Sequence, residues 1–119
     1  MAVRPELVRQ VLDILEDVAR SRATISYKQL SDRVPGLPVR GRLMSDTLVA
    51  VSELSWAARG VLLPVLVVNA GGARLPSDGL YVSLAYYRPE EAAPDKTVAA
   101  RRERERVYRA YPRADSASS

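Results

Sequence analysis

Residues 61–87, VLLPVLVVNAGGARLPSDGLYVSLAYY, decide the expected fold. The run Leu62–Val68 is apolar and rich in β-branched side chains, which is typical of a buried strand. Residues 69–79 contain Asn, Gly, Pro and Asp, which favour a chain reversal. Leu80–Tyr87 then alternates with a period of two, as in a strand with one buried face. The stretch therefore predicts a β-hairpin.

Three helices are expected before this hairpin. Apolar residues recur at helical spacing through residues 5–20, which predicts a first amphipathic helix. Residues 24–25 form a short extended piece. Ser26 and Gln29 then have the spacing of a capping box, which predicts a second helix from residue 27 to about residue 34.

A third helix is expected over Val39–Arg59, after a turn at residues 35–38 that contains two prolines. Gly60 is its expected C-terminal stop. Its predicted core face consists of Met44, Leu48, Val51, Leu54 and Ala58. A fourth helix is expected over residues 95–111, and its charged middle, residues 101–106, should be solvated or bound to a partner.

This order of helix, short strand, helix, turn, helix and hairpin is that of a winged helix-turn-helix, an α+β fold. We expect residues 1–111 to form one domain of this kind, with the basic C-terminal helix included. Residues 112–119 are expected to be a disordered tail. The tip of the hairpin would be the wing.

The composition excludes several kinds of chemistry. The sequence has no Cys and no His, which excludes disulfides, zinc sites and Ser/His/Asp triads. No apolar run approaches the roughly 20 residues that cross a bilayer, so a soluble, cytoplasmic protein with no membrane partner is expected. The excess of Arg over Lys, 16 against 2, indicates a GC-rich genome, such as that of an actinobacterium or one of its phages.

The net charge of +4 is concentrated near the C-terminus. Between Asp95 and Arg113 there are 7 basic and 3 acidic residues, a difference of +4, whereas the rest of the chain has 11 of each. Electrostatic attraction to nucleic acid is therefore expected to begin in this segment.

Two segments resemble the DNA-binding domain of alkylguanine-DNA alkyltransferases and alkyltransferase-like proteins. Thr24–Leu30, TISYKQL, is similar to the segment that opens the helix-turn-helix of that family. Pro64–Asn69 with Gly79–Tyr81 resembles the strand and loop that carry its active-site motif. Where the family has Pro-Cys-His-Arg, residues 68–71 read Val-Asn-Ala-Gly, so alkyl transfer is not possible here. The resemblance implies a winged-helix fold and a relative that binds DNA.

DNA binding is the first functional hypothesis. In a winged helix the N-terminal part of the third helix enters the major groove, and the hairpin tip and a basic helix can reach phosphates. The predicted contacts are Lys28, Arg40, Arg42, Ser45, Arg74, Arg101, Arg102 and Arg106. Asp46 and Glu53 share the outward face of the third helix and would repel phosphate. The alternative for these arginines is that they are solvated surface residues.

Binding to a protein is the second hypothesis. Val49 and Trp56 lie seven residues apart on the expected third helix, away from its core stripe. An exposed Trp is a typical interface anchor, and the alternative is that Trp56 packs beneath a neighbouring element. The partner would be a second copy of the chain or, if the gene comes from a phage, a host protein that this chain inhibits. The basic C-terminal helix is a further candidate surface for such a partner.

Catalysis is the least supported class. Without Cys or His, a metal-dependent nuclease would need clustered carboxylates beside a Lys, and neither Lys28 nor Lys96 is suitably spaced from the available acids. We therefore expect a non-enzymatic binding protein with no catalytic residues, no cofactor and no metal.

Overall fold

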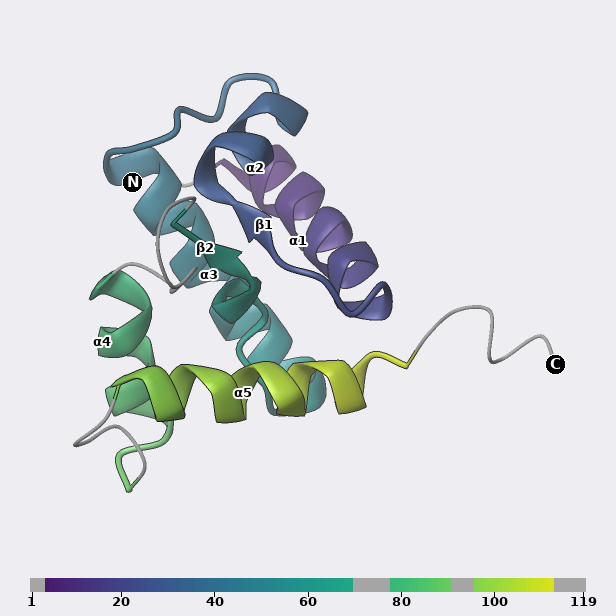
Figure 1. The fold of residues 1–119 in the computed structure, drawn as a ribbon. Helices are drawn as coiled ribbons and strands as arrows, with labels where there is room; N and C mark the ends of the chain where they lie inside the picture. Colours follow the sequence, from purple (N-terminus) through teal and green to yellow (C-terminus); the bar gives the residue numbers. More distant parts are fainter. Residues whose placement is uncertain (1–3, 70–77, 91–95, 113–119) are drawn as a thin grey trace, which may run out of the picture.

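The structure is a computed structural model that describes residues 4–69, 78–90 and 96–112, and it shows a mostly helical α+β protein. Figure 1 shows the arrangement of its elements. The helices are α1 (Pro5–Arg20), α2 (Tyr27–Arg33), α3 (Arg42–Arg59), α4 (Asp78–Tyr87) and α5 (Lys96–Ala110), and η1 (Leu63–Leu66) is a 3-10 turn. The strands are β1 (Ile25–Ser26) and β2 (Val67–Val68).

The first two helices and the short strand between them agree with the sequence analysis. The side chain of Ser26 accepts a hydrogen bond from the Gln29 backbone N–H at 3.0 Å, and the Gln29 side chain accepts one from the Ser26 N–H at 2.9 Å. This reciprocal pair satisfies two of the N–H groups that a helix leaves unpaired at its start. The predicted capping box is confirmed, and it fixes the first residue of α2.

The third helix begins later than expected and buries only part of the predicted face. α3 starts at Arg42, after Gly41, and ends at Gly60, whose left-handed backbone confirms the predicted stop. Its buried residues are Met44, Thr47, Val51, Ser52 and Ser55. The prediction that Leu54 belongs to the core is wrong, since its side chain is 47% exposed. Small hydroxyl residues occupy part of the buried face instead. Ser55 is one of them, and its hydroxyl donates a hydrogen bond to the Val61 carbonyl, in the segment after α3, at 2.8 Å.

The predicted hairpin is wrong. Residues 80–87, expected to be its second strand, belong to α4, and residues 70–77 of the expected wing at residues 69–79 lie outside the described residues. The burial pattern gives the reason. Leu80 and Leu84, four residues apart, face the core, whereas Val82 and Tyr86 are 71% and 78% exposed. A strand would have placed all four on one face, but a helix separates them.

The expected first strand of the hairpin is buried as predicted but is mostly not a strand. Pro64 lies in the 3-10 turn η1, where its missing N–H costs nothing, and only β2 is extended. β2 pairs with β1 in parallel, with Ile25 opposite Val67. The sheet thus joins the segment before α2 to the segment after α3.

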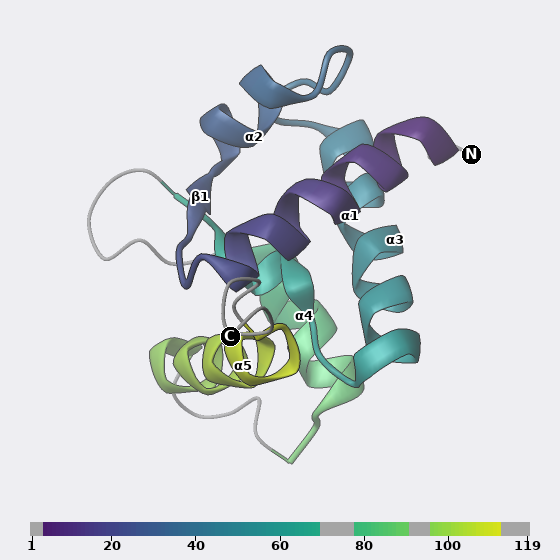
Figure 2. The same cartoon turned by 90° about the vertical axis from the view of Figure 1, so that its right-hand side faces the viewer.

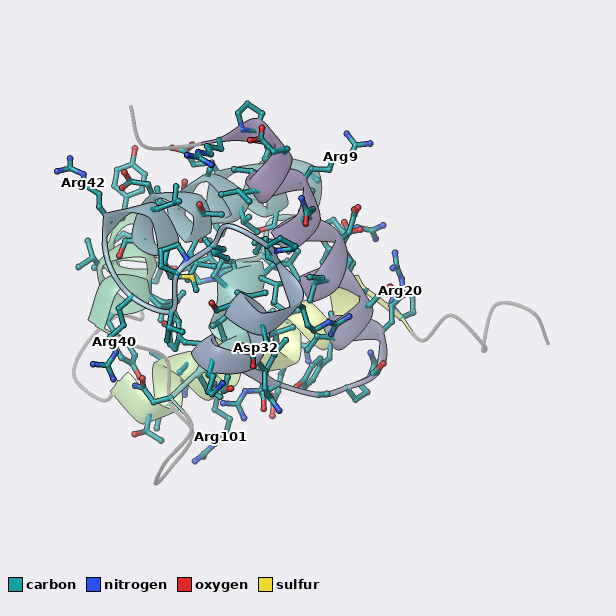
Figure 3. The ribbon with its side chains drawn as sticks, turned by 90° about the horizontal axis from the view of Figure 1, so that it is seen from above. Arg9, Arg20, Asp32, Arg40, Arg42 and Arg101 are labelled. Atoms are coloured by element: carbon teal, nitrogen blue, oxygen red, sulfur yellow. The ribbon has the colours of Figure 1, made fainter. Side chains whose placement is uncertain are left out.

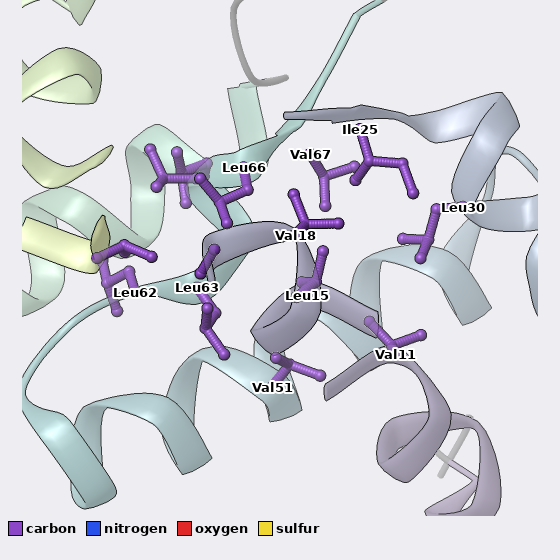
Figure 4. Packing of buried hydrophobic residues seen from close by; sticks show 14 of the residues in the cluster. Val11, Leu15, Val18, Ile25, Leu30, Val51, Leu62, Leu63, Leu66 and Val67 are labelled. Carbon is purple, nitrogen blue, oxygen red and sulfur yellow. The ribbon is translucent and has the colours of Figure 1, made fainter. Parts of the chain in front are cut away.

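The core surrounds η1. Leu62, Leu63 and Leu66 are fully buried and belong to one hydrophobic cluster with Leu15 of α1 and Val51 of α3 (Figure 4). All the helices in the described residues contribute to this cluster. Of those helices, none is long and apolar enough to cross a membrane.

α5 lies across the end of α3 that is opposite to the α2–α3 loop (Figures 1 and 2). The prediction that its charged middle is solvated or bound to a partner is wrong for Glu103, which is fully buried within the protein. The Glu103 carboxylate accepts hydrogen bonds from Arg88 and from the backbone N–H of Leu62. These bonds join α5 to the segments that follow α3 and α4.

Candidate functional site

A pocket of about 400 Å³ lies between the N-terminal ends of α2 and α3, and we call it the α2–α3 pocket. Its lining residues are Ser26, Tyr27, Lys28, Val39, Arg40, Gly41, Met44, Ser45 and Asn69. Lys28, Arg40 and Ser45 belong to the predicted DNA contacts, and the structure brings them together at this one hollow. Buried Met44 supplies an apolar floor, and the polar groups stand at the exposed rim.

The capping box determines where Lys28 points. It sets Tyr27 and Lys28 in the first turn of α2, so both side chains reach the pocket. Lys28 Nζ lies 3.2 Å from the Asp32 carboxylate, one helical turn along α2. Both side chains are more than 60% exposed, at 74% and 63%, so this ion pair is screened by water and weak.

The loop between α2 and α3 determines where Arg40 lies. Leu37 is buried, and its carbonyl accepts a hydrogen bond from the Ser31 hydroxyl, which anchors the middle of the loop. Gly41 caps α3 with a φ of 105°, a conformation that disfavours residues with a Cβ. The Gly41 carbonyl accepts the first helical hydrogen bond from Ser45 at 3.1 Å. Arg40 and Ser45 therefore flank the start of α3.

Two further predicted contacts are not part of this pocket. Arg42 is 86% exposed and forms an ion pair with Asp46 at 3.6 Å, one turn along α3. Figure 3 shows Arg42 extending away from Arg40. Arg74 lies outside the described residues.

The predicted contacts on α5 have two different environments. Arg101 and Arg102 are exposed, whereas Arg106 is half-buried and forms an ion pair with Glu103 at 3.2 Å. None of the three lines the α2–α3 pocket, because α5 lies at the opposite end of α3.

Trp56 has the packed environment that was the alternative to an exposed anchor. The centroid of the Trp56 ring lies 4.8 Å from the centroid of the Tyr87 ring. The Arg88 guanidinium also lies 4.8 Å from the Trp56 centroid. Burial raises the pKa of Tyr87, and the nearby Glu53 carboxylate raises it further. Val49, the other residue predicted for an interface, is 48% exposed.

Sequence reasoning missed Tyr27 and Asn69 as pocket residues. Both stand in the segments that carry the resemblance, which was the signal available. Their proximity depends on the parallel pairing of β1 with β2, which places the residue after β2 beside the start of α2. A smaller hollow of about 70 Å³ shares Tyr27, Met44 and Ser45 with the pocket and extends between α3 and α4.

Among the described residues no cluster of three acidic side chains could hold a metal ion. Comparisons of the chain with protein-family models, with curated proteins and with solved structures found no match.

Proposed function

We propose that this protein binds duplex DNA without catalysis, through the α2–α3 pocket and the start of α3. One observation carries the proposal. Lys28, Arg40 and Ser45, which are 5 to 17 residues apart in the sequence, line one concave surface. Two cations and a hydroxyl are suited to phosphate oxygens, and the exposed start of a helix is suited to a groove.

The charges of this surface favour a polyanion. Arg40 is exposed, and neither Asp32 nor Asp46 lies among the residues that line the pocket with it. Both side chains of the Lys28–Asp32 ion pair are exposed, so Lys28 can leave the Asp32 carboxylate for a DNA phosphate at little cost in free energy. The acidic residues nearby, Asp32 and Asp46, reduce the attraction but each is one turn away from the cation that it pairs with.

The resemblance to alkyltransferase DNA-binding domains supports the same surface. α2, the loop and α3 have the order of a helix-turn-helix, and Asn69 stands where that family has its acceptor Cys. Asn69 lines the pocket, and this position supports the proposed site. The proposal needs no wing, because the residues that line the pocket all lie outside residues 70–77.

The experiment is a titration of random-sequence duplex DNA with the purified protein at low and moderate salt, read by fluorescence anisotropy. We expect dissociation constants on the order of micromolar at low salt, and a steep loss of affinity as salt increases. Arg40→Ala should weaken binding by about tenfold at low salt, because it removes a phosphate contact.

Arg9→Ala is the matched control. Arg9 is exposed on α1, extends from the side of the molecule opposite to Arg40 in Figure 3, and its replacement changes the net charge equally. If both variants weaken binding equally, the attraction is diffuse and the pocket is not the site. Absence of binding at low salt would overturn the proposal.

Binding to a protein is the second candidate, and one observation favours it. On α4 no residue from Gly79 to Tyr87 is charged, and Val82 and Tyr86 are exposed one turn apart. Val49 on α3 is also exposed, so apolar side chains are accessible on both helices.

A partner on this surface is tested by analytical ultracentrifugation and by capture from a host lysate. The double substitution Val82→Ser with Tyr86→Ser should abolish association through α4. Trp56 is left unchanged in this variant because its ring packs against Tyr87. Association that survives the double substitution would exclude this surface.

A further inference from the structure

The exposed face of α5 is basic. The run at residues 101–106, RRERER, contains four Arg and two Glu. In the structure Glu103 is fully buried and is neutralised by Arg88 and Arg106. Among the charged residues of α5 whose exposure the structure describes, Arg104 is half-buried, and Arg101, Arg102, Glu105 and Arg109 are exposed, three positive charges and one negative.

The two exposed arginines at the start of this run are available to a ligand. Neither Arg101 nor Arg102 forms an ion pair with another described residue, in contrast to Lys28, Arg42 and Arg106. Because Glu103 accepts bonds from Leu62 and Arg88, the helix that presents the two guanidinium groups is held to the core. A fixed helix loses little entropy when its side chains bind.

The length of α3 separates this face from the α2–α3 pocket. Arg40 precedes the first residue of α3, and Glu103 contacts Leu62, just past its last residue. An 18-residue helix is about 27 Å long. That separation corresponds to about eight base pairs of duplex, at about 3.4 Å per pair.

The two cationic regions share one side of the molecule. Figure 3 looks along the direction that separates them, and in it Arg40 and Arg101 extend from the same side, whereas Arg9 extends from the opposite side. A straight rod laid along that side would pass both regions.

We propose that Arg101 and Arg102 bind a second group of phosphates on the duplex that occupies the α2–α3 pocket, about eight base pairs away. This inference rests on the proposed function. It makes the protein a reader of duplex length, because only a duplex that spans both regions gains the second contact.

The test compares a linear duplex of about 20 base pairs with a stem-loop of about six base pairs, which spans only about 20 Å. On the long duplex, Arg101→Ala with Arg102→Ala should weaken binding by about tenfold and reduce the slope of log affinity against log salt by about two. On the stem-loop the same variant should change affinity by at most about twofold, the factor for removing one of two independent sites.

The control is Arg9→Ala with Arg20→Ala, two arginines that Figure 3 shows away from Arg40 and Arg101. It removes the same charge and should affect both DNA lengths slightly and equally. If the α5 variant behaves like this control, α5 makes no phosphate contact and the inference is wrong. If it weakens both lengths equally by much more than twofold, the two regions are not separated along the duplex, and the inference is also wrong.

The Arg40→Ala variant distinguishes a failure of the proposed function from a failure of this inference. Arg40→Ala should weaken binding of the long duplex, whatever α5 does. Failure of the wild-type chain to bind either DNA at low salt would overturn the proposed function and this inference with it. Loss with Arg40→Ala but none with the α5 variant would overturn only the inference.

Discussion

The Glu103 carboxylate accepts a hydrogen bond of 2.9 Å from the backbone N–H of Leu62, a residue 41 positions earlier in the chain. The same carboxylate binds Arg88, and Arg88 also donates to the Gly60 carbonyl at 2.7 Å. One buried side chain therefore holds together the end of α3, the residue after α4, and α5.

Glu103→Ala should lower the free energy of unfolding by about 3–5 kcal/mol, because it leaves Arg88 and the Leu62 N–H without their buried partner. Urea denaturation measures this loss. Glu105→Ala is the matched control, since Glu105 is exposed on the same helix and should change stability by less than about 0.5 kcal/mol. Equal losses in the two variants would show that Glu103 does not join these elements.

Gly60→Ala should destabilise the protein by about 1 kcal/mol. Gly60 has a φ of 68°, and a Cβ there would meet no atom within 4 Å, so the cost comes from the backbone conformation alone. Gly60→Asn should cost less, because Asn tolerates the left-handed region better than Ala does. Thermal unfolding of the two variants measures the order, and the reverse order would contradict this explanation.

Asp32→Asn should strengthen DNA binding by several-fold at low salt, because it releases Lys28 from its 3.2 Å ion pair and removes a negative charge beside the pocket. Anisotropy titrations measure the change. Asp13→Asn on α1 is the control, since Asp13 is exposed and its replacement changes the net charge equally. The proposed site predicts a larger gain for Asp32→Asn than for this control.

Stability should be nearly constant between about pH 6 and pH 9 and should fall above about pH 10. The sequence has no His or Cys side chain to titrate in the first interval. Burial raises the pKa of Tyr111, and the Glu16 carboxylate raises it further, although Arg59 and Arg20 oppose the shift. Burial also raises the pKa of Tyr108.

The sign of this effect follows from the protonated phenols. A raised folded-state pKa means that the folded protein holds the phenol proton of Tyr111 more tightly than the unfolded chain does. The contribution of this proton to the free energy of unfolding is therefore complete below the unfolded-state pKa. It is lost as the pH rises through the folded pKa. Tyr111→Phe should flatten the alkaline decline measured by urea denaturation at several pH values. An unchanged decline in that variant would exclude Tyr111 as its source.

The sequence predicted the elements whose signals are local. α1 follows from its apolar spacing, and the capping box of Ser26 and Gln29 fixed the start of α2. Gly60 marked the end of α3. In each case the deciding groups lie within a few residues of one another, so tertiary contacts do not override them.

The sequence did not predict what depends on distant contacts. Leu80, Val82, Leu84 and Tyr86 fit a strand equally well, and only the packing of Leu80 and Leu84 against the core selects a helix for α4. The burial of Glu103 likewise depends on Arg88, which the charge pattern of α5 does not indicate.

The candidate site was predicted in part for the same reason. Lys28, Arg40 and Ser45 were all predicted as DNA contacts because the local helix-turn-helix pattern contains them. Asn69 was not, because its place beside them depends on the pairing of β1 with β2. Arg42 and Arg106 carry the predicted charge but are paired with neighbouring acids on their own helices.

The pairing of Ile25 with Val67 also constrains the order in which the chain folds. These residues are 42 positions apart, so their contact requires closure of a long loop, which is slower than the formation of α1, α2 or α3. Two residues that line the pocket belong to this pairing: Ser26 lies opposite Val68, and Asn69 directly follows Val68. The pocket is therefore a late product of folding, and a nascent chain that ends before residue 67 presents the helices without the binding site.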